Sequence, residues 1–130
     1  MPATKPPTTL LALAVVGGIA LHSYEFTVAT GSGTSSFAFW LLVWSVLPFA
    51  VAFALSQSRV GQARAAGYAW ASLLGSIYMH LSVFVQPTAS TAALGLLFMP
   101  LWNLLLLGPV GLLVVWGLKA SSSSSGSNAA

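Results

Sequence analysis

The sequence predicts an all-α integral membrane protein, a four-helix bundle with short loops, and three observations support this fold class. Hydrophobic residues make up 57% of the 130-residue chain and charged residues only 4%, against about 25% charged residues in soluble proteins. A soluble domain of this length could not bury so much apolar surface, so lipid must solvate the helices. Four mostly apolar runs are long enough to cross the hydrocarbon core, which takes about 20 residues. All four Lys and Arg residues are predicted to lie on one side of the membrane.

The four predicted spans form a single transmembrane domain, residues 1–120. They run over about 8–29, 37–56, 66–85 and 91–118. The fourth run is longer than a crossing requires, so we expect it to tilt or bend at Pro100 and Pro109. The polar run 30–36, rich in Gly, Ser and Thr, predicts a loop between the first two spans. The Ser-rich run 121–130 predicts a disordered tail, because it has nothing to bury.

The positions of the cations predict the orientation of the bundle. Lys5 precedes the first span, Arg59 and Arg64 lie in the loop before the third, and Lys119 follows the fourth. Cytoplasmic loops retain Lys and Arg, so both termini are predicted to be cytoplasmic. The abundance of Ala, Gly and Leu favours the cytoplasmic (inner) membrane of a bacterium. Trp side chains at the predicted interfaces fit an aromatic belt: Trp40, Trp44 and Trp116.

The first segment has a second interpretation as a cleavable signal peptide. Lys5 would be its basic end, Leu10–Gly17 its apolar stretch and Gly18–Ala20 its cleavage site. Removal of residues 1–20 would leave three spans in the same orientation, because the basic loop would stay cytoplasmic.

His22 and His80 are the candidate site residues. Both of their spans are predicted to run outward, and each imidazole lies about 10 Å inside the outer boundary at 1.5 Å per residue. Glu25, the only acidic residue, follows His22 by three positions and so shares its helix face. Two imidazoles at one depth could ligate haem b between the helices. Alternatively, His22, Glu25 and His80 could hold a metal ion.

The same residues also have structural interpretations. Each imidazole would donate a hydrogen bond to a carbonyl, a hydroxyl or Glu25 and stabilise the bundle, or would handle protons or a substrate. Small residues precede each His at spacings of four, Ala14 and Gly18 on one span, Ser72 and Ser76 on the other. They would either leave space for a cofactor or let helix backbones approach. A further row of small residues follows the third span: Gly67, Ala71 and Gly75.

Asn103 is a polar residue within the fourth predicted span. It lies about 18 Å from the outer face if that span begins near Thr91, which is close to the middle of the membrane. An amide at that depth is expected to cross-link helices by hydrogen bonding, and the alternative is a role in a pore or a substrate site.

Several function classes are excluded by composition. The chain has no Cys, which excludes disulfides, thiolate metal sites and covalent haem attachment. Its net charge of +3 rests on four dispersed cations, so we expect no nucleic-acid partner. A single acidic residue removes paired-carboxylate chemistry within one chain. No nucleophile motif such as G-x-S-x-G occurs, although a site shared between subunits stays open.

Three functional hypotheses remain. The leading one is a non-enzymatic accessory or interaction subunit, whose partners are the lipid bilayer and either further copies of the chain or a membrane complex. The second is a redox or metal-binding bundle that uses His22 and His80. The third is an oligomeric channel or transporter, since a protomer of this size would have to build a pathway at a symmetric interface.

Overall fold

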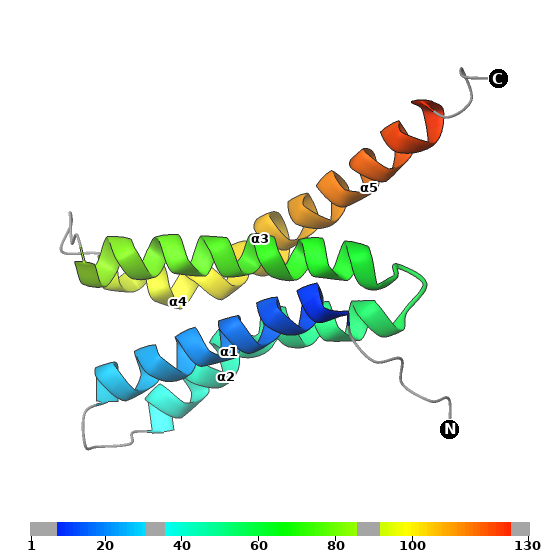
Figure 1. Cartoon of the computed structure of the whole chain (residues 1–130). Helices are drawn as coiled ribbons and strands as arrows, with labels where there is room; N and C mark the ends of the chain where they lie inside the picture. Colours follow the sequence, from blue (N-terminus) through cyan, green and yellow to red (C-terminus); the bar gives the residue numbers. More distant parts are fainter. Residues whose placement is uncertain (1–7, 31–35, 86–91, 126–130) are drawn as a thin grey trace, which may run out of the picture.

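The computed structural model describes residues 8–30, 36–85 and 92–125, and these residues are helical with short connections (Figure 1). The helices are α1 (Thr9–Thr30), α2 (Ser36–Gln57), α3 (Gln62–His80) with its π-helical continuation η1 (Leu81–Val85), α4 (Ala92–Trp102), the π-helical turn η2 (Asn103–Leu107) and α5 (Gly108–Ser125). Four stretches are long and apolar enough to cross a membrane: Thr9–Val28, Ser36–Gln57, Gln62–Val85 and Leu97–Ser121. The predicted all-α bundle with four membrane-spanning helices is therefore confirmed.

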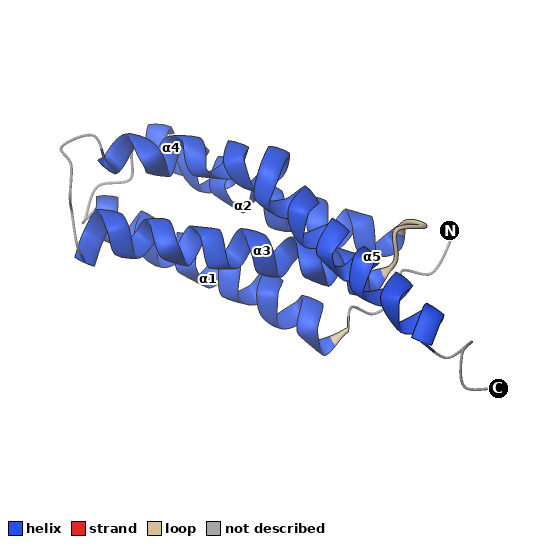
Figure 2. Cartoon of the chain, turned by 90° about the horizontal axis from the view of Figure 1, so that it is seen from above, coloured by secondary structure: helices blue, strands red, loops and turns tan. Residues whose placement is uncertain are grey.

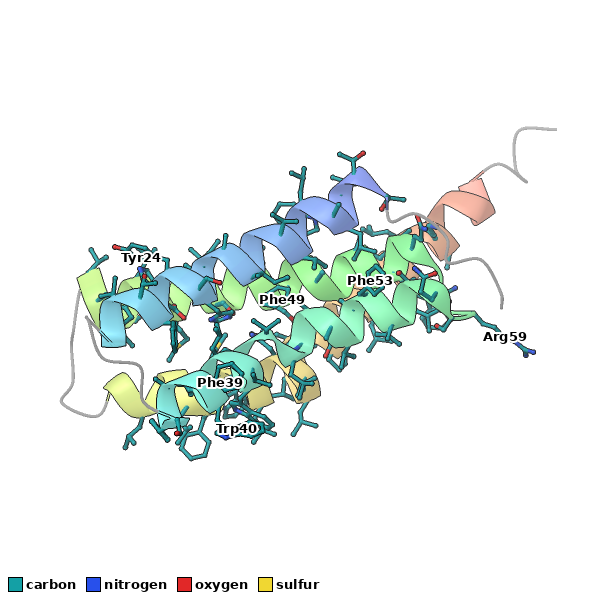
Figure 3. All side chains as sticks on the ribbon, turned by 90° about the horizontal axis from the view of Figure 1, so that it is seen from below. Tyr24, Phe39, Trp40, Phe49, Phe53 and Arg59 are labelled. Atoms are coloured by element: carbon teal, nitrogen blue, oxygen red, sulfur yellow. The ribbon has the colours of Figure 1, made fainter. Side chains whose placement is uncertain are left out.

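Successive membrane-spanning helices run in opposite directions, so the first span begins and the last span ends at the same end of the bundle (Figure 1). The start of α1, the connection between α2 and α3, and the end of α5 all lie at one end of the bundle (Figure 1). Arg59 lies at that end and Tyr24 at the opposite one (Figure 3). This arrangement agrees with the predicted grouping of cations, of which Lys5 lies outside the described residues.

Two predicted boundaries differ from the structure. The third span begins at Gln62 instead of 66, because Gly61 turns the chain with a φ of 85° and the following Ala-rich residues propagate a helix. Arg64 therefore lies in the first turn of α3 and not in the loop. The tail predicted as disordered from Ser121 continues as helix to Ser125, and the Ser121 Oγ donates to the carbonyl of Gly117 at 3.0 Å. The rest of the tail, 126–130, lies outside the described residues.

The fourth span bends in its middle, as predicted from its length and its prolines. Pro100 lies inside α4 and cannot donate a backbone hydrogen bond to the preceding turn. The π-helical turn η2 follows, and α5 then diverges from α1 and α2 (Figures 1 and 2). Pro109 follows directly after η2, at the second residue of α5, and it too lacks a backbone N–H.

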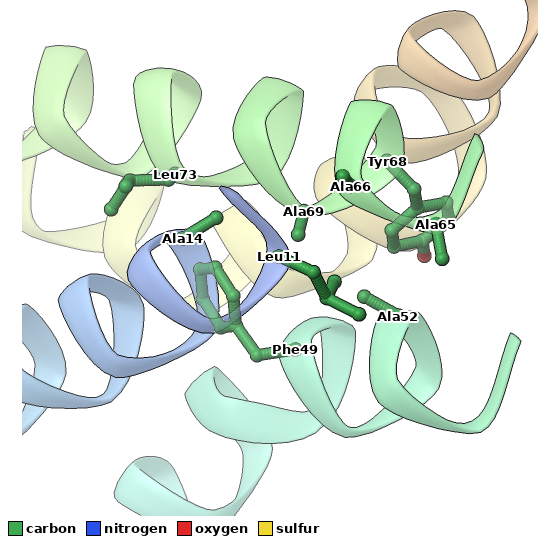
Figure 4. Close-up of a cluster of buried hydrophobic side chains, with 9 residues drawn as sticks. All are labelled: Leu11, Ala14, Phe49, Ala52, Ala65, Ala66, Tyr68, Ala69 and Leu73. Atoms are coloured by element: carbon green, nitrogen blue, oxygen red, sulfur yellow. The ribbon is translucent and has the colours of Figure 1, made fainter. Parts of the chain in front are cut away.

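The apolar core lies between α1, α2 and α3 and is built largely from small side chains (Figure 4). Its buried members are Leu11, Ala14, Phe49, Ala52, Ala65, Ala66, Tyr68, Ala69 and Leu73. Alanines let the helices approach closely, and the larger side chains fill the gaps between them. Because Leu11 and Ala14 come from α1, this core includes the segment that a signal-peptide cleavage would remove.

Glycines set the close approach of α5 to α3. A Cβ on Gly67 would lie 2.6 Å from the carbonyl oxygen of Gly111, and a Cβ on Gly111 would meet the Gly67 carbonyl and the Ala71 methyl. A Cβ on Gly75 would likewise meet Leu107. The predicted row of small residues on the third span therefore packs against η2 and α5, which is the structural use expected of it.

Candidate functional site

The carboxylate of Glu25 joins both histidines of the chain. The His22 Nδ1 lies 2.7 Å from one carboxylate oxygen, and the His80 Nδ1 lies 3.0 Å from the other. The side chains of His22, Glu25 and His80 are 5%, 12% and 18% exposed, so the group is largely buried. We call these three side chains the His–Glu–His group. The structure thus brings together all three residues that were predicted as a site.

Two parallel helices position the group. His22 and Glu25 are three residues apart on α1, which places them on one face. His80 is the last residue of α3, which packs beside α1 and runs in the same direction (Figure 1). Contact with one shared carboxylate places the two imidazoles at a similar level along the bundle. The helix continues beyond His80 as the π-helical segment η1, a local irregularity that is frequent at functional sites.

The hydrogen bonds define which ring atoms remain available. Against an ionised Glu25, which only accepts hydrogen bonds, each imidazole donates through its Nδ1–H. The second ring nitrogen, Nε2, is then left as an acceptor in a neutral ring. The Nε2 of His22 is buried and has no hydrogen-bond partner among the described protein atoms. The His80 ring is the more exposed of the two and packs beside Phe84 and Tyr24, with ring centroids 4.9 and 5.9 Å away.

A cavity of about 60 Å³ lies beside the group, between α1, α2, α3 and α4. Its polar lining consists of His22, Glu25, Ser45 and Ser76. The apolar lining residues are Phe26, Ala38, Leu41, Leu42, Phe84 and Met99. A space of this kind is large enough for a few water molecules, which need roughly 10–15 Å³ each by this measure and polar partners. His22, whose Nε2 is buried without a partner among the described protein atoms, is one of the residues that line this space.

Haem does not fit between the two histidines in this arrangement. The ring of Phe49 packs against Gly18, where it fills the space that small residues were expected to leave beneath the imidazole. The same ring lies 5.9 Å from the His22 ring, centroid to centroid, and Phe49 is fully buried. The 60 Å³ cavity is much smaller than a porphyrin. Ligation by both rings would require Phe49 to leave its place and both Nδ1 contacts to be rearranged.

A metal ion also does not fit the hydrogen-bonded geometry. Two tetrahedral zinc ligands, each 2.0–2.2 Å from the ion, lie about 3.3–3.6 Å apart. The Nδ1–O distances of 2.7 and 3.0 Å are shorter and are those of direct hydrogen bonds. Within the described ranges, no group of three or more His, Cys, Asp or Glu side chains is placed to hold a metal ion.

Asn103 links the fourth span to the third, as expected of a buried amide. Its Nδ2 donates to the Ser76 Oγ at 3.0 Å, and the residue is only 1% exposed. Ser76 also lines the cavity beside His22, so Asn103 meets the polar wall of that cavity from the other side. The Oδ1 of Asn103 has no partner among the described protein atoms.

Sequence analysis identified Ser72 and Ser76 as small residues that precede His80, but it did not identify Tyr68 or the unpaired hydroxyls as part of the site. Tyr68 and Ser72 are buried on α3, and neither hydroxyl has a partner among the described protein atoms. A buried polar group without a partner costs about 1–3 kcal/mol, so two such hydroxyls on one helix face are unusual. The signal was visible in the sequence, because Tyr68, Ser72, Ser76 and His80 recur at intervals of four residues, a spacing that places each side chain next to the following one along the helix.

Comparison with known proteins does not assign this chain to a family. No protein-family model, no curated protein and no solved structure matches it. Any functional assignment must therefore be built from the geometry of its own residues.

Proposed function

We propose that this small multi-pass membrane protein binds and releases a proton at the His–Glu–His group, and that it acts in the class of proton-handling channels and transporters. The observation that carries the proposal is the single carboxylate shared by two imidazoles, largely buried in a membrane-spanning bundle. Imidazole titrates near neutral pH in its ordinary state, which suits it to reversible proton binding.

The charge of the group supports a proton-binding role. With both rings neutral, Glu25 leaves the group with a net charge of −1. One additional proton on an Nε2 makes an imidazolium and brings the net charge to zero. An uncompensated charge is costly inside a membrane, so protonation removes the free-energy cost of the net negative charge. Among the residues that the structure describes, Tyr24 is a titratable side chain packed against the group, by its ring contact with His80, whereas Arg59 lies at the opposite end of the bundle (Figure 3).

Nitrogen-15 NMR of the histidines tests this function directly, because the chain has only two His residues. In the purified protein in nanodiscs, we expect both rings to carry hydrogen on Nδ1. We also expect the pair to take up one proton when the sample is acidified, measured over a pH range from about 8 to about 5. The Glu25→Gln variant should uncouple the rings, so that their tautomers and titrations become independent of each other.

A matched control is Thr27→Val, which changes α1 close to Glu25 but removes only a hydrogen bond from the Thr27 hydroxyl to the carbonyl of Tyr24. This variant should titrate as the unchanged protein does. The proposal is overturned if neither ring changes its protonation over this pH range, or if Glu25→Gln leaves both titrations as they were.

A second candidate function is that of an accessory subunit in a larger membrane assembly. The packing of α5 favours it, since this helix packs mainly against α3 and diverges from α1 and α2 (Figure 1). Val110, Leu113 and Val114 on α5 are more than half exposed. Either lipid or another helix would cover them, the latter from a further copy of the chain or from another subunit.

Cross-linking in native membranes separates these outcomes. The chain has no Cys, so a Val114→Cys variant carries a single thiol. A disulfide-linked dimer would support self-association, and a defined adduct with another membrane protein would support the accessory role. Leu74→Cys is a control on an exposed position of α3. If both variants stay monomeric under oxidising conditions, the accessory function loses its support.

We propose that the chain lies in the cytoplasmic membrane of a bacterium, on the basis of its cation distribution and composition.

A further inference from the structure

A row of buried hydroxyls on α3 leads from the His–Glu–His group toward the basic end of the bundle. Tyr68, Ser72, Ser76 and His80 are spaced by four residues, so each lies next to the following one along a line that winds slowly around α3. The exposed fractions of Tyr68, Ser72 and Ser76 are 3%, 0% and 1%, so none of them faces lipid or bulk water. We call these three residues the hydroxyl row.

The outer end of the hydroxyl row meets the cavity beside His22. Ser76 lines that cavity and accepts a hydrogen bond from the Asn103 Nδ2 at 3.0 Å. His22 lines the same cavity and has a buried Nε2 without a partner. The residue whose Nε2 would exchange a proton with the inside of the bundle therefore borders the same space as Ser76, the outer end of the hydroxyl row.

The inner end of the row lies close to the basic side of the membrane. Tyr68 is six residues after the start of α3 at Gln62, which is about 9 Å along the helix. It belongs to the core cluster, where it lies near Ala65 (Figure 4). Its hydroxyl has no partner among the described protein atoms, and the same holds for the Ser72 hydroxyl and the Asn103 Oδ1.

The spacing of the row suits bridging by single water molecules. Residues four apart on an α-helix are separated by about 6 Å along its axis. For Ser72 and Ser76, whose hydroxyls both lie close to the backbone, two hydrogen bonds of about 2.8 Å in sequence span nearly the same distance. A water between each pair of hydroxyls would satisfy polar groups that the protein leaves unpaired, and buried waters typically occupy such positions.

We infer that the hydroxyl row, together with Asn103, is a hydrated path within a single chain through which the Nε2 of His22 exchanges its proton with the cytoplasmic side. The inference rests on the proposed proton binding at the His–Glu–His group and adds its route of access. The substrate is a hydrated proton. The 60 Å³ cavity and a row with one hydroxyl at every fourth residue have room and polar partners for species of the size of water. The path runs inside one protomer, so it does not require the symmetric interface that a chain of this size seemed to need.

Hydration of the path is tested by thiol labelling of full-length single-cysteine variants. Thiol reagents react with the thiolate, which requires water around the sulfur. In inverted membrane vesicles, a small water-soluble methanethiosulfonate reagent should modify Ser72→Cys from the cytoplasmic side. Ser58→Cys, in the exposed turn before α3, is the positive control, and Leu74→Cys, two residues from Ser72 and exposed toward lipid, is the negative control. If Ser72→Cys is as unreactive as Leu74→Cys, or reacts only from the outer side, the path is overturned.

Proton movement is tested in vesicles of phosphatidylethanolamine and phosphatidylglycerol that enclose a pH-sensitive dye. The unchanged protein should acidify the vesicles under an imposed potential, and Tyr68→Phe and Ser72→Ala should slow this by at least about tenfold. Ser82→Ala, whose hydroxyl only donates to the Tyr78 carbonyl, is the matched control and should leave the flux unchanged. Equal fluxes for Ser72→Ala and Ser82→Ala would refute the route.

The two proposals fail in different ways. If the histidines titrate as a coupled pair but Ser72→Cys is unreactive and no flux exceeds that of empty vesicles, the path is wrong and the proton-binding group stands. If the histidines do not titrate, the proposed function itself is wrong. Ser72→Ala and Tyr68→Phe each remove an unpaired hydroxyl, so neither should prevent folding. Their histidine titrations, measured in parallel, show whether the group is intact.

Discussion

The backbones of Gly67 on α3 and Gly111 on α5 are in direct contact, and neither position has room for a side chain. A Cβ on Gly67 would lie 2.6 Å from the Gly111 carbonyl oxygen, and the converse contact is equally obstructed. Close backbone approach of this kind is how helices associate in lipid, where no hydrophobic force drives them together. The position of α5 therefore depends on these two residues.

Gly111→Ala is expected to destabilise the bundle by about 1–3 kcal/mol, because its methyl group would meet a backbone that must shift. Gly117→Ala is the control on the same helix, since nothing lies within 4 Å of a Cβ there. It should be neutral or slightly stabilising through helix propensity. Thermal unfolding in mild detergent measures both. Equal melting temperatures for the two variants would contradict the contact.

The hydrogen bond between Asn103 and Ser76 should contribute a measurable coupling between the third and fourth spans. A double-mutant cycle with Asn103→Ala and Ser76→Ala isolates this term from the loss of packing. Polar pairs within membranes typically give about 0.6 kcal/mol and at most about 1.7 kcal/mol. Unfolding in mixed detergent micelles provides the four free energies. Strict additivity of the two substitutions would mean that the 3.0 Å contact contributes nothing.

Two tryptophans anchor neighbouring helices through their indole N–H groups. The Trp70 Nε1 donates to the carbonyl of Leu10 at 3.1 Å, and the Trp44 Nε1 donates to the carbonyl of Leu97 at 3.1 Å. Trp70→Phe and Trp44→Phe should each lower the free energy of unfolding by about 0.5–1.5 kcal/mol, because the donor is lost and most of the ring remains.

Trp40→Phe is the control for these two substitutions, because the Trp40 side chain is 66% exposed. It lies at the surface of α2 (Figure 3). Chemical unfolding of the three variants in the same detergent should leave Trp40→Phe unchanged within error. A loss as large as that of Trp70→Phe would show that the hydrogen bonds are not the cause.

The orientation of the bundle is accessible to impermeant maleimide labelling, because the natural chain has no Cys. Ser58→Cys and Lys119→Cys should react only from the cytoplasmic side, since basic segments stay there. Val28→Cys, near the other end of α1 and 51% exposed, should react only from the outside. Labelling of Ser58→Cys in intact cells would reverse the orientation and the direction of the proposed proton path.

Composition and charge alone determined that this chain is a four-span helical membrane protein. The reason is physical: about 20 apolar residues must satisfy their backbone within one helix to cross lipid, and the solvent enforces this whatever the packing. The equal depth of His22 and His80 also followed from helix rise, because 1.5 Å per residue converts sequence position into depth. The row of Gly67, Ala71 and Gly75 was recognisable because small residues at intervals of four line one face.

Only the tertiary structure decided what these residues do together. Depth does not specify which way a helix is turned about its axis, so the sequence could not show that Glu25 reaches across to His80. It could not show either that Phe49, a residue of another helix, fills the space at Gly18 that a haem would need. The bend that brings Asn103 to Ser76 likewise depends on how the fourth span packs against α3. Packing sets the rotation of each helix about its axis, the identity of its neighbours and the space between them. Packing therefore brings the two histidines together at one carboxylate.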